Sequence, residues 1–362
     1  MAALPTIDDV ARAAQVSRQT VSNVLNSPGI VREQTRTRVE AAIHELGYRP
    51  HASARRLRTR KSFTIGVALH PFKNGISGNV LDRFLHALTE RADLRGMRIL
   101  LYTATDAAGE IEALRRLRDG ADVDAFVLTS TFHNDPRAEW LIAERVPFVT
   151  FGRPWGIPDL EDADHLWVDV DGFAGVRDAT ARLLEQGARR PAFIGWPSPS
   201  GTGDERRRGW QHATADLGID HLHREVEDAV AQGTAAALEL LSLEDAPDAL
   251  VCVSDSIALG AMMAASSLGR HDVPVVGYDN TAVAEAVGLS SVDQPVEEAA
   301  SAALDLLFGA TGNDARSREA VNEEPRHRLL APRLVERAWT NLAPGETTGT
   351  ANAGNHNRKD PS

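Results

Sequence analysis

The first fifty residues carry apolar positions at helical spacing. Thr6 and Asp9 have the spacing of a capping box, and the apolar residues after Thr6 recur three or four positions apart. These residues are Ile7, Val10, Ala11 and Ala14. After a short connection, Ser17 is a candidate N-cap for a second helix, and a third helix ends at Gly47. The apolar stripes of these two helices are Val21, Val24 and Leu25, and Val39, Ile43 and Leu46. The first and second helices, joined by the short connection before Ser17, predict a helix-turn-helix.

The rest of the chain alternates short apolar runs with segments of helical length. The runs are 63–69, 98–102, 125–128, 147–151, 191–195, 249–253 and 273–278. Near-continuous apolar strands separated by helices are typical of parallel sheets that are covered on both faces. About 280 residues of this pattern exceed one comfortable sheet, so we expect two α/β lobes. Ligands of such sheets bind beyond the carboxyl ends of the strands.

The composition is that of an ordinary globular chain. The 362 residues are 43% hydrophobic and 25% charged, and no apolar run approaches the length of a membrane span. No signal-peptide pattern precedes Thr6. The single cysteine, Cys252, excludes a disulfide framework, and the twelve histidines show no metal-ligand spacing. We therefore expect a cytoplasmic protein that contacts no membrane and uses no metal or cofactor.

Charge is distributed unevenly along the chain. Residues 1–62 contain eleven Lys and Arg but five Asp and Glu, whereas the other 300 residues contain 28 basic and 46 acidic side chains. A basic head on an acidic body favours a DNA-binding module joined to a second domain. Charge alone leaves open a basic tail that only increases solubility.

The second predicted helix has an outer face suited to reading DNA. Arg18 can pair with guanine and Gln19 with adenine, while Ser22 and Asn23 can reach phosphates or base edges. Small helical bundles also carry polar outer faces, so this face by itself leaves a purely structural helix open. The basic charge around it favours the DNA-binding interpretation.

Four ordered blocks in this region, 6–11, 16–26, 35–39 and 46–50, resemble the headpiece of the lactose-repressor (LacI/GalR) family. The resemblance implies a homodimer that binds double-stranded operator DNA. The DNA contacts it implies in the headpiece are Thr6, Ser17, Arg18, Gln19, Thr20, Ser22, Asn23 and Asn26. Two positions depart from the family: Arg32 stands where a serine often caps the third helix, and Asn23 where arginine is frequent. The operator sequence is therefore not transferable.

Residues 50–57 resemble the family's hinge helix, which orders on operator DNA. The resemblance adds Arg55, Leu57 and Arg58 to the DNA contacts, with Leu57 entering the minor groove. An apolar wedge flanked by arginines is the architecture that kinks DNA at a minor groove.

Residues 62–340 resemble the family's two-lobed core, which is similar to periplasmic binding proteins. By that resemblance a small effector, a sugar by our interpretation, binds between the lobes. Its polar contacts are expected to be His70, Arg153, Arg206, Ser254, Asp279 and Gln294, and Trp196 is the candidate platform for a sugar ring. Asp255 is expected to hold a strand–helix turn rather than touch the ligand.

The fold class expected is therefore α/β, with an all-α helix-turn-helix headpiece and a two-lobed core of parallel sheets. The domains are a headpiece at 1–49, a hinge at 50–61, the core at 62–340 and a disordered tail at 341–362. Within the core, lobe 1 is expected at about 62–165 and 294–325, and lobe 2 at about 166–293 and 326–340.

The function expected is a repressor of carbohydrate-utilisation genes that a sugar releases from DNA. The family also contains corepressor-type regulators, and the sequence leaves the sign of the response open. A sugar- or nucleotide-processing enzyme is the remaining alternative. It is disfavoured because the chain has no phosphate-binding loop motif and no nucleophile elbow, and residues 201–204 do not match the dinucleotide fingerprint.

Overall fold

The computed structural model describes residues 5–48, 61–69, 76, 78–156, 166–309 and 326–337. The chain divides into two compact units, Met1–Thr64 with Arg115–Asp124, and Ile65–Leu114 with Ala125–Ser362. Most of the predicted hinge and all of the predicted tail lie outside the described residues. No helix in the described ranges is long and apolar enough to span a membrane.

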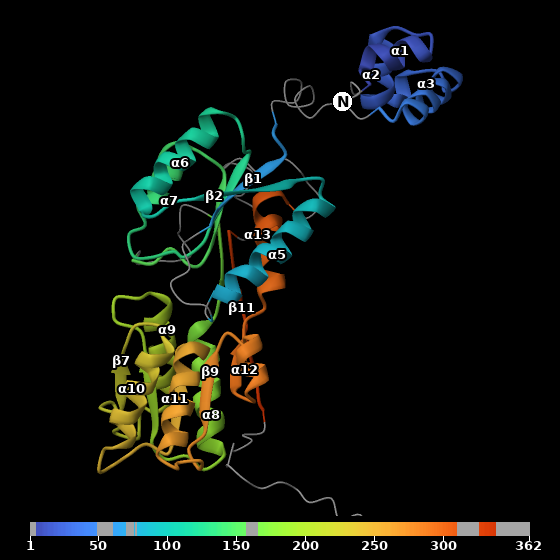
Figure 1. The fold of residues 1–362 in the computed structure, drawn as a ribbon. Coiled ribbons are helices and arrows are strands. Elements are labelled where there is room, and N and C mark those ends of the chain that lie inside the picture. Colours follow the sequence, from blue (N-terminus) through green and yellow to red (C-terminus); the bar gives the residue numbers. More distant parts are fainter. Residues whose placement is uncertain are drawn as a thin grey trace, which may run out of the picture. The chain divides into compact units, whose positions relative to one another are not determined.

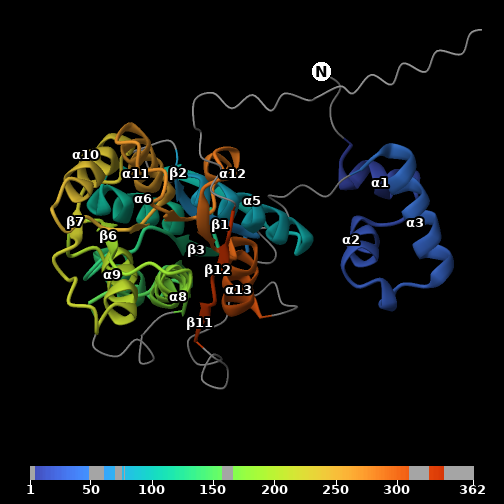
Figure 2. The ribbon, with the colours of Figure 1, turned by 90° about the horizontal axis from the view of Figure 1, so that it is seen from below.

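The N-terminal bundle contains the predicted helix-turn-helix (Figure 2). Its elements are α1 (Ile7–Ala13), α2 (Arg18–Asn26), the 3-10 turn Pro28–Ile30 and α3 (Glu33–Leu46). Val10, Val21 and Val39, one from each helix, are fully buried and form the centre of a small apolar core. The fold class predicted for this region is confirmed.

Local chemistry determines where these helices begin and end. The Thr6 side chain accepts from the Asp9 backbone N–H and the Asp9 carboxylate accepts from the Thr6 N–H, which completes the predicted capping box. Ser17 caps α2 by accepting from the Thr20 N–H. Arg32 makes no side-chain cap at α3, as the departure from the family predicted, and Gly47 ends α3 at a φ of 62°.

One predicted apolar position in α3 is wrong. Leu46 is 37% exposed, and the buried residues of the helix are Val39 and Ala42. Leu46 is the last residue of α3, directly before the C-cap Gly47, where the helix ends.

Residues from 64 onward form two six-stranded sheets, as the alternating pattern predicts. The first sheet has the order β11 (His327–Leu330), β5 (Leu166–Val170), β4 (Phe148–Phe151), β3 (Ala125–Leu128), β1 (Thr64–Leu69), β2 (Arg98–Thr103). The second has the order β12 (Arg333–Val335), β10 (Ser290–Asp293), β9 (Val275–Tyr278), β8 (Ala249–Cys252), β6 (Pro191–Gly195), β7 (His223–Glu225). The recorded strand pairs are parallel, except that β12 runs antiparallel to β10.

Each sheet has its own apolar core and its own helices (Figure 1). The helices that follow strands of the first sheet are α5 (Gly78–Leu94), α6 (Ala107–Asp119) and α7 (Pro136–Ala143). A further helix of this lobe, α13 (Val296–Phe308), follows β10 of the second sheet but packs beside α5. The second sheet carries α8 (Gly172–Glu185), α9 (Thr202–Ala213), α10 (Val230–Leu241), α11 (Asp255–Ser267) and α12 (Ala282–Ala286). In it α8 packs beside α9, and α10 beside α11. The two-lobed core is confirmed.

The predicted border between the lobes is wrong at two strands. Both β5 and β11 were assigned to lobe 2, but β5 pairs with β4 and with β11 in the first sheet. Burial explains this placement, because Leu166 and Val168 of β5 belong to the apolar core of the first lobe. The chain instead crosses to the second lobe at Asp171, the N-cap of α8, and again between β11 and β12.

Candidate functional site

The outer face of α2 presents the residues predicted to read DNA. Arg18 and Gln19 are exposed, whereas Ser22 and Asn23 are half-buried. Gln19 Nε2 donates to Asn23 Oδ1 at 3.0 Å, so the two amides restrain one another. Each amide keeps further donor and acceptor positions for a base edge.

The other predicted DNA contacts have more local roles in the structure. The Thr6 hydroxyl donates to Asp9 at 2.7 Å, and the hydroxyls of Ser17 and Thr20 lie 2.9 Å apart at the start of α2. Asn26 is the last residue of α2. Arg55, Leu57 and Arg58 lie outside the described residues.

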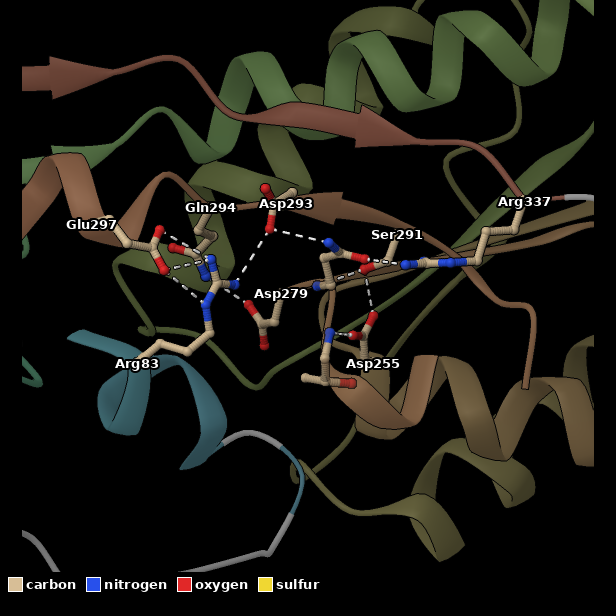
Figure 3. Close-up of polar contacts among 10 residues, drawn as sticks. Arg83, Asp255, Asp279, Ser291, Asp293, Gln294, Glu297 and Arg337 are labelled. Carbon is tan, nitrogen blue, oxygen red and sulfur yellow. Dashed lines mark hydrogen bonds and ion pairs between the residues drawn. The ribbon is translucent and has the colours of Figure 1, made fainter. Parts of the chain in front are cut away.

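A second group of predicted residues meets at the carboxyl end of β9. Asp279 follows this strand with a φ of 106°, a backbone conformation that residues other than glycine rarely adopt. Its Oδ1 accepts from Gln294 Nε2 at 2.6 Å and lies 3.7 Å from Arg206 Nη2. Figure 3 shows Asp279 and Gln294 side by side, and all three side chains are buried.

Arg206 is held in this group by the start of α9. Its Nη1 donates to the Val253 carbonyl at 2.6 Å, and its guanidinium carbon lies 3.5 Å from the centre of the Tyr278 ring. The same carbon lies 5.5 Å from the Trp196 ring, which places the candidate platform beside Arg206. Among the described residues, Arg206 Nε, Trp196 Nε1 and the Tyr278 hydroxyl are buried without a hydrogen-bond partner.

Burial changes the acidity of this group. Burial raises the pKa of Asp279 to about 7, against the opposing effects of Arg206 and of the hydrogen bond from Gln294. Burial likewise raises the pKa of the Tyr278 hydroxyl. Asp279 can therefore accept or donate a hydrogen bond near neutral pH.

Arg153 is bound by two carboxylates that the sequence analysis did not single out. It follows β4; its Nε donates to Asp169 Oδ2 at 2.7 Å and its Nη2 to Glu205 Oε2 at 3.1 Å. Asp169 belongs to β5 and Glu205 to α9, so the Arg153–Glu205 pair joins the two lobes. Two signals were present in the sequence: Asp169 interrupts an apolar run, and Glu205 precedes Arg206.

Two further predicted effector contacts are Ser254 and His70. Ser254 is fully buried, caps α11 by accepting from the Ile257 N–H, and donates to Asp228 Oδ1 at 2.6 Å. Its hydroxyl is therefore used within the protein. His70 lies outside the described residues.

The strand ends around the site are fixed by a second set of hydrogen bonds (Figure 3). Asp255 accepts from the Thr281 N–H at 2.7 Å and from the Ser291 hydroxyl at 2.6 Å, and so holds the turn after β9 as expected. Arg83 of α5 donates to Asp293 at 3.3 Å and to Glu297 of α13 at 3.2 Å. Because Asp293 ends β10 of the second sheet, Arg83 is a second link between the lobes.

In the described ranges, no group of three His, Cys, Asp or Glu side chains is arranged to hold a metal ion. Arg206, Asp279 and Gln294 form a buried polar group beside the ends of parallel strands, the position at which sheets of this kind bind ligands.

Comparison with known proteins gives the family. Residues 6–51 match the bacterial regulatory proteins of the lacI family, and residues 180–340 match the periplasmic binding protein-like domain. The chain is 36% identical over 333 residues to the HTH-type transcriptional regulator CelR of Thermobifida fusca, which covers 86% of this chain and 94% of that relative. The chain belongs to the LacI family.

Solved structures agree with this assignment. A complex of the transcriptional regulator CelR with cellobiose has 31% identity and a TM-score of 0.64, covering 92% of this chain and 99% of that one. A Lac repressor bound to ONPG in the repressed state has 25% identity and a TM-score of 0.74, with coverage of 92% and 99%. This LacI-family chain is a DNA-binding transcriptional regulator.

Proposed function

We propose that this LacI-family regulator is a homodimeric repressor of carbohydrate-utilisation genes, released from operator DNA by a sugar bound between the core lobes. The observation that carries the proposal is the buried group of Arg206, Asp279 and Gln294 beside Trp196. An arginine and a carboxylate suit neighbouring sugar hydroxyls, and an indole suits the apolar face of a sugar ring. The relative CelR, whose solved complex contains cellobiose, supports the choice of a sugar.

The proposed dimer follows from how one headpiece covers DNA. A single helix-turn-helix reads about half an operator, and two in fixed register supply the affinity that a genome of competing sites requires. We therefore propose a pseudo-palindromic operator, with α2 in the major groove and Arg55, Leu57 and Arg58 of the hinge at its centre. Sedimentation that gives a monomer with full operator affinity at micromolar concentration would contradict this.

Release requires that the sugar prefers one arrangement of the lobes. A preference of roughly 10²-fold corresponds to ~2.7 kcal/mol, which is enough to shift a balanced equilibrium. The Arg153–Glu205 and Arg83–Asp293 pairs join the lobes and are the contacts that such a shift would change. A hinge of about eight residues forms no stable helix alone, so its folding on DNA depends on how the lobes of the dimer space it.

We further propose that the chain acts by binding and not by catalysis, in the cytoplasm where its operator lies. Its named relatives are transcriptional regulators. Arg206, Asp279 and Gln294 lie against one another, so together they offer both donors and acceptors to the hydroxyls of a ligand.

The test is fluorescence anisotropy on upstream DNA, titrated with mono- and oligosaccharides and with nucleobases. A sugar should release the wild-type protein, and Arg206→Lys should need a higher concentration, because Lys lacks the planar donor fork of Arg. Arg91→Lys, at an exposed position of α5, is the matched control.

Three outcomes of this titration would change the proposal. Tighter DNA binding with sugar would make the protein a corepressor-type regulator. An effector that is a nucleobase, or sugar release unaffected by Arg206→Lys, would overturn the sugar site.

A further inference from the structure

We propose that Asp169 and Glu205, by pairing with Arg153, restrict the effector to uncharged molecules and exclude phosphorylated sugars. The inference rests on the proposed function, because it concerns the same site between the lobes. It names the two carboxylates as residues that determine specificity.

The first observation is that the positive charge of Arg153 is already paired with two carboxylates. Its guanidinium lies 2.7 Å from Asp169 and 3.1 Å from Glu205, and all three side chains are at most 13% exposed. A phosphate that approached Arg153 would have to displace one of these carboxylates. The displaced carboxylate would then remain buried without its partner, which is strongly unfavourable.

The second observation concerns the other arginines of α9 at the site. Arg206 faces Asp279, and Arg208 pairs with Glu205 on its exposed side. Every guanidinium in the described part of the site therefore has a carboxylate partner. A phosphate monoester brings a charge of about −1.5 to −2, and it would have to compete with these carboxyl groups for the same guanidinium groups.

The third observation concerns the buried polar atoms of the site that have no hydrogen-bond partner. They belong to neutral side chains or to Arg206, whose charge already faces Asp279. The buried atoms without a partner in the described ranges include Trp196 Nε1, the Tyr278 hydroxyl and Arg206 Nε. Sugar hydroxyls can accept from the two N–H groups and donate to Asp279, so a neutral polyol satisfies what the site leaves open. An added dianion would instead lie close to the carboxylates of Asp169 and Glu205, and these like-charge contacts disfavour its binding.

The experiment is calorimetric titration of the full-length protein with neutral sugars and their phosphates. The probes are glucose, cellobiose, glucose 6-phosphate and 6′-phosphocellobiose. In the wild type, the neutral member of the better-binding pair should bind at least about 100-fold more tightly than its phosphate. Operator release, measured on the same samples, should follow the same order.

Two variants test the assigned residues. Glu205→Gln and Asp169→Asn each remove one negative charge at nearly constant shape, so the ratio of neutral to phosphorylated affinity should narrow at least about tenfold. Glu239→Gln is the matched control, because Glu239 also pairs with an arginine, Arg224, but is exposed on α10. Its ratio should equal that of the wild type.

The outcomes separate the two proposals. A phosphorylated sugar that binds the wild type as tightly as its neutral form overturns this inference and leaves a sugar-responsive regulator standing. A neutral nucleobase as effector overturns the sugar proposal and agrees with the exclusion of charge. If one variant fails to fold, the wild-type comparison and the other variant still decide the inference.

Discussion

At the residue scale, Asp279 combines burial, a left-handed backbone and a titratable side chain. Burial raises its pKa from the usual 3.8 to about 7. The folded protein therefore keeps this proton between about pH 4 and pH 7, where the unfolded chain has released it. Because the folded state binds the extra proton, this residue makes the protein less stable as the pH rises through that window.

We expect Asp279→Asn to remove this dependence. Between about pH 5 and pH 7.5 the free energy of unfolding of the variant should rise by about 2–3 kcal/mol relative to that of the wild type. Urea unfolding at both pH values measures the change. The exposed Asp216→Asn should show no such difference, and equal pH profiles for wild type and Asp279→Asn would show that Asp279 is ionised throughout.

Arg153 and Ser254, whose roles as effector contacts remain predictions, have partners within the protein that the sequence does not identify. The resemblance placed both among the effector contacts, and both lie near the ends of central strands. In the structure, the Arg153 guanidinium is taken up by Asp169 and Glu205, and the Ser254 hydroxyl by Asp228. A polar side chain that could bind a ligand can also form its hydrogen bonds with residues that are distant in the sequence.

At the element scale, α2 is the helix whose outer face we propose reads the DNA sequence. Arg18 and Gln19 are exposed on it, and Gln19 is braced by Asn23. Base contacts discriminate between sequences, whereas phosphate contacts strengthen all sequences alike.

We expect Arg18→Ala and Gln19→Ala each to cost roughly 1–3 kcal/mol of operator binding and to relax specificity at particular base pairs. Arg12→Ala, on the exposed side of α1, removes a charge from the same bundle and should affect operator and random DNA equally. Competition gel shifts at fixed salt measure both. Equal loss on operator and random DNA for Arg18→Ala would mean that α2 is not the reading helix.

The beginning of α9 is a second element with a specific requirement. Gly201 precedes α9 with a φ of 57°, and a Cβ there would lie 2.7 Å from the Trp155 ring of the first lobe. This close approach lets the segment after β4 pack on the helix that carries Glu205 and Arg206.

Gly201→Ala should therefore lower the free energy of unfolding by about 2–4 kcal/mol, from backbone strain and from the clash with Trp155. Gly218→Ala is the matched control, with a φ of 65° and no atom within 4 Å of the added Cβ. It should cost only about 1 kcal/mol, from the left-handed backbone alone. Thermal and urea unfolding compare the two, and equal losses would show that Trp155 moves away freely.

At the scale of the whole molecule, the core consists of two lobes joined by chain crossings and by a few polar contacts. Arg83 connects α5 and α13 with Asp293 at the end of β10. Asn280, which directly follows Asp279, also donates to Asp293, at 3.2 Å. Asp293 therefore connects the residue next to Asp279 with Arg83 of the first lobe.

We expect Arg83→Met to reduce the population of the lobe arrangement seen here. Fluorescence transfer between dyes on the two lobes should report a wider distance distribution without effector, and the sugar concentration for half-release should change by about threefold or more. Arg91→Met removes an exposed arginine of the same helix and should change neither quantity. An unchanged distance distribution in Arg83→Met would mean that this pair does not hold the lobes.

Features that depend on neighbours along the chain could be predicted from the sequence. Local hydrogen bonding explains the capping pair Thr6 and Asp9, the cap Ser17 and the end of α3 at Gly47. Apolar periodicity explains the central strands. Features that depend on residues far apart in sequence became visible only in the folded structure. The structure places β5 and β11 in the first sheet. The apolar pattern of a strand does not say which sheet it joins, and this depends on the core in which its side chains are buried. The structure also matched Arg153 with Asp169 and Glu205, because a buried charge must find its counter-charge wherever the fold brings one.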